Sequence, residues 1–181
     1  MKQNTTQENL KLVLSQEKIF QKIKELAEQI DKDYNEEPII LIGILKGAFI
    51  FLADLVRHLK NPNVQIDFVR VKSYGMSDTS SENVEITKDL ELPLEGKNVI
   101  LVEDIVDTGI TLKFLYNYIK TFKPKSLKIC VLIDKKERRK VNVPIDYVGF
   151  EIERGFLVGY GLDFAEKFRH LPEIKEIIKN G

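Results

Sequence analysis

Two adjacent acids and a short turn of small residues follow an apolar segment in the middle of the chain. Val99–Val102 is apolar throughout, Glu103 and Asp104 come next, and Asp107–Thr111 reads Asp-Thr-Gly-Ile-Thr. An uninterrupted apolar run is typical of a buried strand in a parallel sheet. Ligands of open α/β sheets bind beyond the carboxyl ends of such strands, so we expect this segment to contribute to a ligand site.

The residue types in this segment favour a phosphorylated sugar as the ligand. A turn that opens a helix directs unpaired backbone N–H groups and the positive end of the helix dipole at its ligand, usually a phosphate. Glu103 and Asp104 would repel that phosphate unless they held a divalent cation or accepted hydrogen bonds from sugar hydroxyls. The alternative is a plain surface turn with Asp107 as the helix N-cap, a position where Asp is favoured.

A second candidate anion site is Leu45-Lys46-Gly47, where an apolar segment gives way to a helical pattern. A lysine between a strand end and a glycine can offer an anion a positive charge and close backbone N–H groups. The alternative is a solvated lysine beside a turn glycine. The segment lacks the spacings of a P-loop or a dinucleotide fingerprint, which argues against a kinase-like or NAD-binding protein.

Later segments carry candidates for binding a flat base and an anion. Lys135 lies in the charged run Asp134–Arg139, most of which we expect to be a solvated loop. As a donor without acceptor capacity, Lys135 would select 6-oxopurines over 6-aminopurines. Phe156 suits stacking on a base; the alternative is a buried core residue. Asp163 could ligate Mg²⁺; the alternative is an acidic residue in a turn. Arg169 suits a phosphate, although an exposed salt bridge is its commoner role.

Short apolar runs alternate with helical patterns along the chain, which predicts right-handed βαβ crossovers. The expected strands are Ile39–Ile44, Val64–Val71, Val84–Ile86, Val99–Val102, Leu127–Ile133, Tyr147–Phe150 and Phe156–Tyr160. The expected helices are a segment capped by Ser15 and ending near Tyr34, Ala48–Leu59, and Leu112–Lys120. The fold class is therefore α/β, with a mainly parallel twisted sheet covered by helices on both faces. We expect the first dozen polar residues to be loosely held, and the N- and C-terminal segments to form a small hood over the carboxyl edge.

The bulk properties describe an ordinary globular protein. The 181 residues fit one domain, 1–181, and Lys plus Arg equals Asp plus Glu at 28 each, so charge gives no argument for nucleic acid or membrane partners. Cys130 is the one cysteine and lies in an apolar run, which indicates a core residue and no disulfide. We see no membrane-spanning stretch and no signal-peptide core, and expect a cytoplasmic protein.

Taken in order, the segments LKG, SYG, VEDIVDTG, LIDK and FLVGYGLDFAEKFR resemble the motifs of the hypoxanthine-guanine phosphoribosyltransferases, within the type I phosphoribosyltransferase family. The resemblance extends from Ile39 to Pro172. It implies the type I fold and Mg²⁺-dependent transfer of the 5-phosphoribosyl group from phosphoribosyl pyrophosphate (PRPP) to N9 of hypoxanthine or guanine. The products would be IMP or GMP and pyrophosphate, the reaction of purine salvage. The resemblance also implies two Mg²⁺ ions per active site during turnover and a homodimer or homotetramer.

The resemblance assigns the sugar-phosphate contacts to named residues. Asp107 would exchange a proton with purine N7. The 5′-phosphate would bind to Asp107, Thr108, Gly109, Ile110 and Thr111. The ribose would contact Glu103 and Asp104. Pyrophosphate would bind to Leu45, Lys46, Gly47 and Arg169.

The remaining contacts implied by the resemblance concern the purine, the metal and a closing loop. The purine would contact Ile105, Lys135, Phe156, Leu157 and Asp163. The metal ligands would be Glu103, Asp104 and Asp163. A polar loop that starts at Ser73 and Tyr74 would close over the site, which protects an oxocarbenium-like transition state from water.

The sequence differs from the family's motifs at one place, and two alternative functions remain open. Glu153-Arg154-Gly155 stands where relatives often have Pro-Asp-Lys before the stacking Phe156. A xanthine or broad-range 6-oxopurine phosphoribosyltransferase would share the fold and these motifs. A regulator that senses PRPP and binds nucleic acid would need a DNA-binding segment or a basic surface, and the zero net charge does not indicate one.

Overall fold

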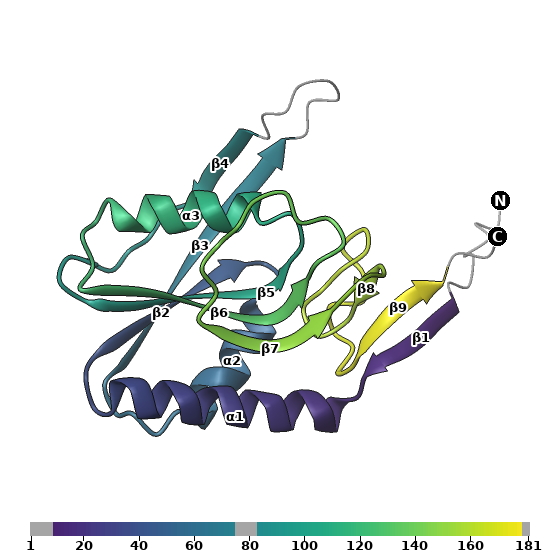
Figure 1. Cartoon of the computed structure of the whole chain (residues 1–181), viewed down its shortest axis with the longest axis horizontal. Coiled ribbons are helices and arrows are strands. Elements are labelled where there is room, and N and C mark those ends of the chain that lie inside the picture. The colour runs from purple at the N-terminus through teal and green to yellow at the C-terminus, as the bar shows by residue number, and fades with distance from the viewer. Residues whose placement is uncertain (1–8, 75–82, 179–181) are drawn as a thin grey trace.

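A six-stranded sheet forms the centre of the molecule (Figure 1). The computed structural model describes residues 9–74 and 83–178. The strands lie in the order β4-β3-β2-β5-β6-β7, and every neighbouring pair is parallel except β3 and β4. Their bounds are β2 (Ile39–Leu45), β3 (Val64–Tyr74), β4 (Asn83–Lys88), β5 (Asn98–Val106), β6 (Ser126–Lys135) and β7 (Tyr147–Ile152). The predicted α/β class with a mainly parallel sheet is confirmed.

Helices cover both faces of this sheet. In Figure 1, α1 (Gln16–Tyr34) and α2 (Phe49–His58) lie below the sheet and α3 (Ile110–Lys120) lies above it. The Ser15 hydroxyl caps α1 as predicted, because it accepts a hydrogen bond from the Lys18 N–H at 3.4 Å. The central strands are buried on both faces, which explains why their sequences read as unbroken apolar runs.

Alternate residues of β2 divide between the two cores. Ile39 and Leu41 join the cluster that packs against α1 and α2, whereas Ile40 and Ile42 join the cluster that packs against α3. This alternation is the period of two expected for a strand. Cys130 in β6 is completely buried, and burial raises the pKa of its thiol, so it is the inert core residue that the sequence predicted.

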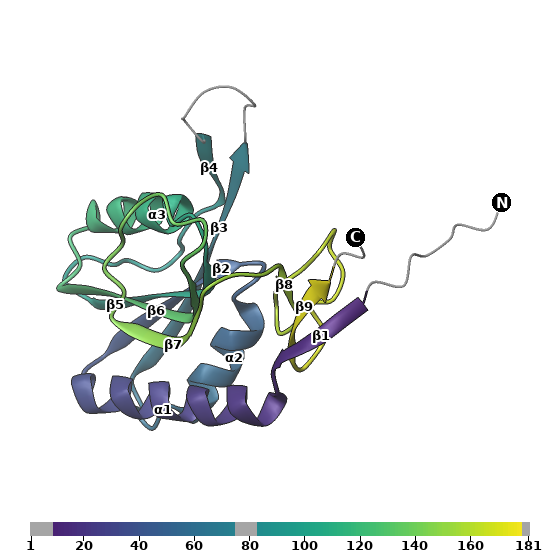
Figure 2. The ribbon, with the colours of Figure 1, turned by 45° about the vertical axis from the view of Figure 1, so that its right-hand side comes forward.

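Segments from the two ends of the chain form a second, three-stranded antiparallel sheet beside the first (Figure 2). It contains β1 (Asn9–Leu14), β9 (Ile174–Ile178) and the short strand β8 (Leu157–Val158), in the order β1-β9-β8. This small sheet is the predicted hood. The expectation that the first dozen residues are loosely held is wrong for residues 9–12, because they pair with β9.

The strands differ in their bounds from those predicted, and three of these differences affect candidate site residues. Parallel pairing continues β5 to Val106, so Glu103 and Asp104 lie within the strand and do not follow it. Parallel pairing likewise continues β6 to Lys135, and Asp134 and Lys135 are buried. Of the rest of their charged run, Lys136–Arg138 is exposed as predicted, whereas the Arg139 side chain is only 16% exposed. The expected strand Phe156–Tyr160 is reduced to β8, because Gly159 begins a tight turn.

Within residues 9–74 and 83–178, no helix is long and apolar enough to span a membrane. Ser73 and Tyr74 form the end of β3. The polar loop predicted to close over the site continues from them through residues 75–82, which lie outside the described residues.

Candidate active site

The turn between β5 and α3 has the geometry of an anion-binding loop. Gly109 is the N-cap of α3 with φ +83°, and a Cβ there would meet the Val141 carbonyl oxygen at 2.7 Å. Only glycine fits this position, for reasons of both backbone conformation and space. The N-cap is therefore Gly109, so the alternative role of Asp107 as an ordinary N-cap does not apply.

A cavity of about 190 Å³ opens at this turn, and we call it the turn cavity. Its lining includes the predicted residues Glu103, Asp104, Ile105, Asp107, Thr108, Gly109 and Thr111. Ile110 is not part of the lining; its N–H donates to the Thr108 hydroxyl at 3.4 Å. The structure thus brings most of the predicted phosphate and ribose residues to one hollow at the start of a helix, where backbone N–H groups favour an anion.

The two acids of β5 share a poorly solvated position. Burial raises the pKa of Glu103 well above 4.5, and the neighbouring Asp104 charge adds to the rise. Burial also raises the pKa of Asp104, which is only 7% exposed. Two carboxylates in this position are stabilised by a cation or by hydroxyl donors. Their environment suits the ribose and metal roles predicted for them.

Glu103→Gln should stabilise the protein at neutral pH. Because its pKa is raised on folding, the stabilising contribution of Glu103 is fully present below its unfolded pKa near 4.5 and is lost as the pH rises through the folded pKa. We expect Glu103→Gln to raise the melting temperature at pH 7.5 by about 2–4 °C, which is about 1 kcal/mol for a chain of this length. The gain should shrink as the pH falls toward 4.5.

Thermal unfolding of wild type and variant between pH 4.5 and 8 measures this effect. Glu28→Gln is the matched control, because Glu28 is exposed on α1 and should change the melting temperature little at any pH. A lower melting temperature for Glu103→Gln at pH 7.5 would contradict the argument.

The predicted pyrophosphate residues also converge. Gly47 lies against the acid pair, because a Cβ on it would meet Asp104 Oδ2 at 2.0 Å. Gly161 approaches the same loop, because a Cβ added to it would lie 2.1 Å from the Gly47 carbonyl oxygen. Leu45 ends β2, and the peptide bond from Leu45 to Lys46 is cis. The Leu45–Gly47 loop is thereby held at the carboxyl edge, next to β5.

A carboxylate that the sequence did not single out, Glu166, stands between the two predicted pyrophosphate-binding cations. Lys46 Nζ lies 2.6 Å from Glu166 Oε2, and Arg169 lies 3.3 Å from Glu166 Oε1. Arg169 also pairs with Asp163 at 2.8 Å and donates to the Gly161 carbonyl at 2.7 Å, yet its Nε is buried and without a hydrogen-bond partner in the described chain. The Lys46 hydrogen bond lowers the pKa of Glu166, so this carboxylate is ionised and occupies cations that a diphosphate would need.

Glu166→Gln should therefore strengthen pyrophosphate binding. Both members of the Lys46–Glu166 pair are largely exposed and screened by water, so we expect removal of the competing charge to lower the dissociation constant only about twofold to fivefold. Calorimetric titration with magnesium pyrophosphate measures the change. Glu173→Gln is the control, because Glu173 pairs with Lys175 on the hood. Weaker binding by Glu166→Gln would mean that Glu166 orients the cations and does not compete for them.

A second cavity of about 230 Å³, the base cavity, lies next to the turn cavity. All five predicted purine contacts line it: Ile105, Lys135, Phe156, Leu157 and Asp163. Phe156 is 48% exposed, so it is not a core residue. Its ring packs edge-on against the Phe164 ring, with 5.5 Å between the ring centroids. An open aromatic face beside apolar side chains suits a flat heterocycle.

Asp107 lines both cavities and carries an unused oxygen. Its Oδ1 is buried and has no hydrogen-bond partner within residues 9–74 and 83–178, while Lys135 Nζ lies 3.6 Å away. Its Oδ2 lies 3.3 Å from Arg138, a cavity residue that the sequence analysis missed. The Lys135 side chain is only 8% exposed and also lies 3.6 Å from Glu137. A buried carboxylate oxygen that lies beside a cation and has no hydrogen-bond partner is well suited to accept a hydrogen bond from a ligand.

The predicted metal ligands do not form a closed cage. Among the described residues, no group of three or more His, Cys, Asp or Glu side chains is arranged to hold a metal ion. Asp163 instead pairs with Arg169, although it lines the base cavity together with Asp104. Two adjacent carboxylates with raised pKa values still fit Mg²⁺, which commonly binds one or two protein carboxylates and takes its other ligands from water and phosphates.

A cavity of about 610 Å³, larger than the turn cavity and the base cavity, lies elsewhere and is lined by none of the predicted site residues. It lies between α1, α2 and residues 160–172. Its polar groups bind one another: the Tyr160 hydroxyl donates to the Asp54 carboxylate, and His58 Nδ1 lies 2.8 Å from the Asp54 carbonyl oxygen. Size alone therefore does not identify the functional site.

Comparisons with known proteins agree with this geometry. A family model described as the phosphoribosyl transferase domain matches residues 10–165. The chain is 54% identical to a hypoxanthine-guanine phosphoribosyltransferase of Aquifex aeolicus over 166 residues, covering 91% of this chain and 93% of that protein. A crystal structure of a hypoxanthine-guanine phosphoribosyltransferase from Bacillus anthracis matches with a TM-score of 0.89 and 48% identity, covering 94% of this chain and 100% of that one. A hypoxanthine phosphoribosyltransferase of Trypanosoma cruzi matches with a TM-score of 0.88 and 40% identity, covering 94% and 96%.

Proposed function

Because this chain belongs to the phosphoribosyl transferase family, and within it to the hypoxanthine-guanine phosphoribosyltransferases, we propose that PRPP is its phosphoribosyl donor and that hypoxanthine and guanine are its acceptors. It is a purine-salvage pentosyltransferase. The proposed reaction breaks the bond between C1 of the ribose and pyrophosphate and forms the bond from C1 to purine N9. The products are IMP or GMP and pyrophosphate.

The observation that carries this proposal is the place of Asp107. It lines both the turn cavity, which suits a sugar phosphate, and the base cavity, which suits a purine. Asp104 and Ile105 are also shared between the two cavities. A ligand that fills both would bring its sugar and its base together at these shared residues near the carboxyl end of β5, as joining them requires.

The polar residues around the sugar have separate roles in the proposed reaction. The turn at Gly109 binds the 5′-phosphate, and Glu103 with Asp104 binds the ribose hydroxyls and Mg²⁺. Bound Mg²⁺ would supply positive charge to the leaving pyrophosphate. Lys46 and Arg169 bind the same leaving group, while the β5 acids favour the positive charge that develops on the ribose.

The residues of the base cavity orient and activate the purine. Phe156 stacks on the ring, and the Leu157 backbone meets its edge. Lys135 donates to the exocyclic O6, which excludes 6-aminopurines. Asp107 Oδ1 exchanges the proton at N7, so that N9 can attack C1 as a better nucleophile. Holding the two substrates in this geometry supplies much of the rate, since no covalent enzyme intermediate is needed.

We also propose a cytoplasmic homodimer or homotetramer with two Mg²⁺ ions per site during turnover. A crystal structure of a Trypanosoma cruzi relative, 40% identical, concerns the role of its C-terminal region in oligomeric state and activity. In the present chain the C-terminal strand β9 pairs with both β1 and β8.

The experiment that tests the function is nucleotide formation from PRPP and Mg²⁺ with hypoxanthine, guanine, xanthine and adenine in parallel. Turnover of hypoxanthine and guanine without adenine would support the proposal. Strong use of xanthine would move the substrate assignment to a broader 6-oxopurine enzyme. PRPP binding without turnover of any purine would favour a sensor of PRPP.

A further inference from the structure

Three consecutive backbone carbonyls at the anion-binding turn accept hydrogen bonds from one short segment, residues 139–141. The Arg139 guanidinium donates to the Val106 carbonyl at 3.2 Å and to the Asp107 carbonyl at 3.1 Å. The Thr108 carbonyl accepts from the N–H groups of residues 140 and 141 at 2.9 Å and 3.2 Å. The carbonyl side of the turn is therefore bound to the β6–β7 loop.

These bonds also fix the direction of the N–H groups of the turn. In a planar trans peptide the N–H of one residue points opposite to the carbonyl of the residue before it. The N–H groups of Asp107, Thr108 and Gly109 therefore face away from residues 139–141. That segment is not part of the turn cavity, whose lining includes all three of these turn residues.

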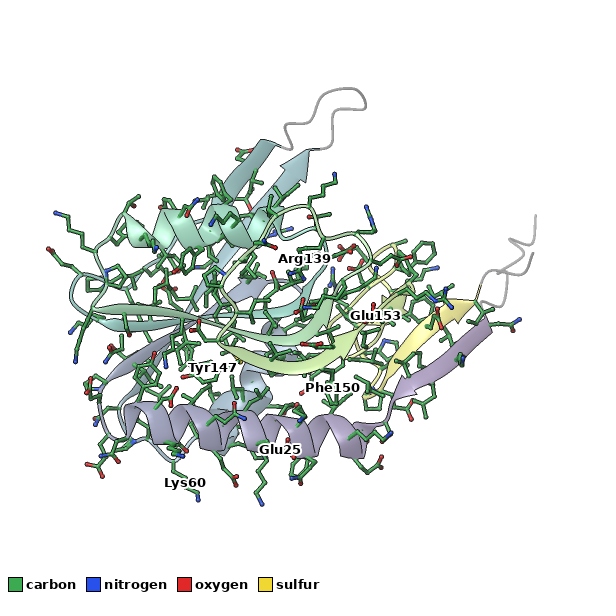
Figure 3. All side chains as sticks on the ribbon, in the orientation of Figure 1. Glu25, Lys60, Arg139, Tyr147, Phe150 and Glu153 are labelled. Carbon is green, nitrogen blue, oxygen red and sulfur yellow. The ribbon has the colours of Figure 1, made fainter. Side chains whose placement is uncertain are left out.

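Arg139, which is labelled in Figure 3, is itself held in place by buried partners. Its guanidinium pairs with the carboxylate of Asp134, which is 3% exposed, and donates to the Lys135 carbonyl at 3.1 Å. Lys136 pairs with the other oxygen of Asp134 but donates to no carbonyl of the turn. The planar fork of an arginine can reach several acceptors at once, which a lysine cannot do.

We propose that Arg139 is a positioning residue that holds the turn 107–109 with its N–H groups directed at the phosphate of the substrate. The inference rests on the proposed function, because it takes a sugar phosphate as the ligand of the turn. It assigns Arg139 no contact with substrate. Its role is to bind the carbonyl side of the turn, so that the N–H side is organised before the ligand arrives.

The test compares Arg139→Met with Lys136→Met, because both variants remove one cation from Asp134 and only the first removes donors from the turn. The probe is ribose 5-phosphate, titrated by calorimetry and by the ¹⁵N–¹H NMR signals of Thr108 and Gly109. We expect Arg139→Met to weaken binding about tenfold or more and to reduce the ligand-induced shifts of both signals. Lys136→Met should change affinity less than about twofold, and Arg139→Lys should restore part of the loss.

The outcomes separate this inference from the proposed function. If wild type turns over PRPP and Arg139→Met binds ribose 5-phosphate as well as Lys136→Met does, the positioning role is wrong and the function stands. If wild type binds ribose 5-phosphate but turns over no purine, the proposed function is wrong and the Arg139 comparison still decides the positioning role. If wild type does not bind ribose 5-phosphate, the positioning role is wrong, and the turnover of PRPP alone decides the proposed function. Should Arg139→Met fail to fold, Arg139→Lys carries the comparison, with an expected loss between those of wild type and full removal.

Discussion

Asp107→Asn will reduce the kcat of nucleotide formation by about 10²- to 10⁴-fold, the range typical of a lost general acid–base group. Asparagine keeps the shape of the side chain but cannot exchange the N7 proton. Asp107 Oδ1 is buried and accepts no hydrogen bond in the described chain, although Lys135 Nζ lies 3.6 Å away, so this oxygen is available to the purine. Because the phosphate binds mainly to backbone N–H groups, we expect the affinity for PRPP to change only a few-fold.

Steady-state kinetics with saturating PRPP and Mg²⁺ measures this loss, and Asp89→Asn provides the control. The Asp89 carboxylate accepts a hydrogen bond from the Tyr118 hydroxyl and lines neither the turn cavity nor the base cavity. Its replacement should leave kcat near that of wild type. A kcat for Asp107→Asn within about tenfold of wild type would rule out proton exchange by Asp107.

Lys135→Met will weaken the use of hypoxanthine and guanine by about 10- to 150-fold in kcat/KM, the range for a lost hydrogen bond from a charged donor. The Lys135 side chain is nearly buried at the edge of the base cavity, so water cannot easily replace its ammonium group. The difference in kcat/KM between hypoxanthine and adenine should shrink, because the donor that disfavours an amino group is gone.

Initial rates with varied purine concentration test this prediction, and Lys136→Met is the matched control. Lys136 is the next residue along the chain, but its side chain is 43% exposed and pairs with Asp134. It should retain the purine selectivity of wild type. If Lys135→Met lowers activity with unchanged selectivity between hypoxanthine and adenine, Lys135 does not recognise O6.

Features that lie close together in the sequence were the most predictable. The apolar run of β5, the acids and the glycine turn are one continuous segment, so local patterning placed the turn cavity at a strand end. Lys135 and Phe156 are predicted base contacts from their residue types and Leu157 from the resemblance, and the structure brings all three to one cavity.

Features created by contacts between distant segments were not predictable from local patterns. The strand β1 follows a polar N-terminal segment and exists because it pairs with β9, far away in the sequence. Asp134 belongs to a charged run, which usually indicates solvent, yet parallel pairing with β5 draws it into the sheet. Glu166 stands between Lys46 and Arg169 only after the chain has folded. In each case tertiary pairing overrode the local pattern.

Because of the hood, the turn cavity and the base cavity depend on segments that are synthesised at different times. The turn cavity is built from residues 103–112, whereas the Phe156 carbonyl accepts a hydrogen bond from Ile177, and Leu157 pairs with Glu176. The β9 strand that makes these bonds pairs in turn with Asn9–Leu14, at the opposite end of the described chain. A nascent chain on the ribosome thus contains every lining residue of the turn cavity well before β9 is available to pair with the strand of the base cavity. Such late, long-range closure is slow in folding, so we expect the base cavity to be completed after the turn cavity.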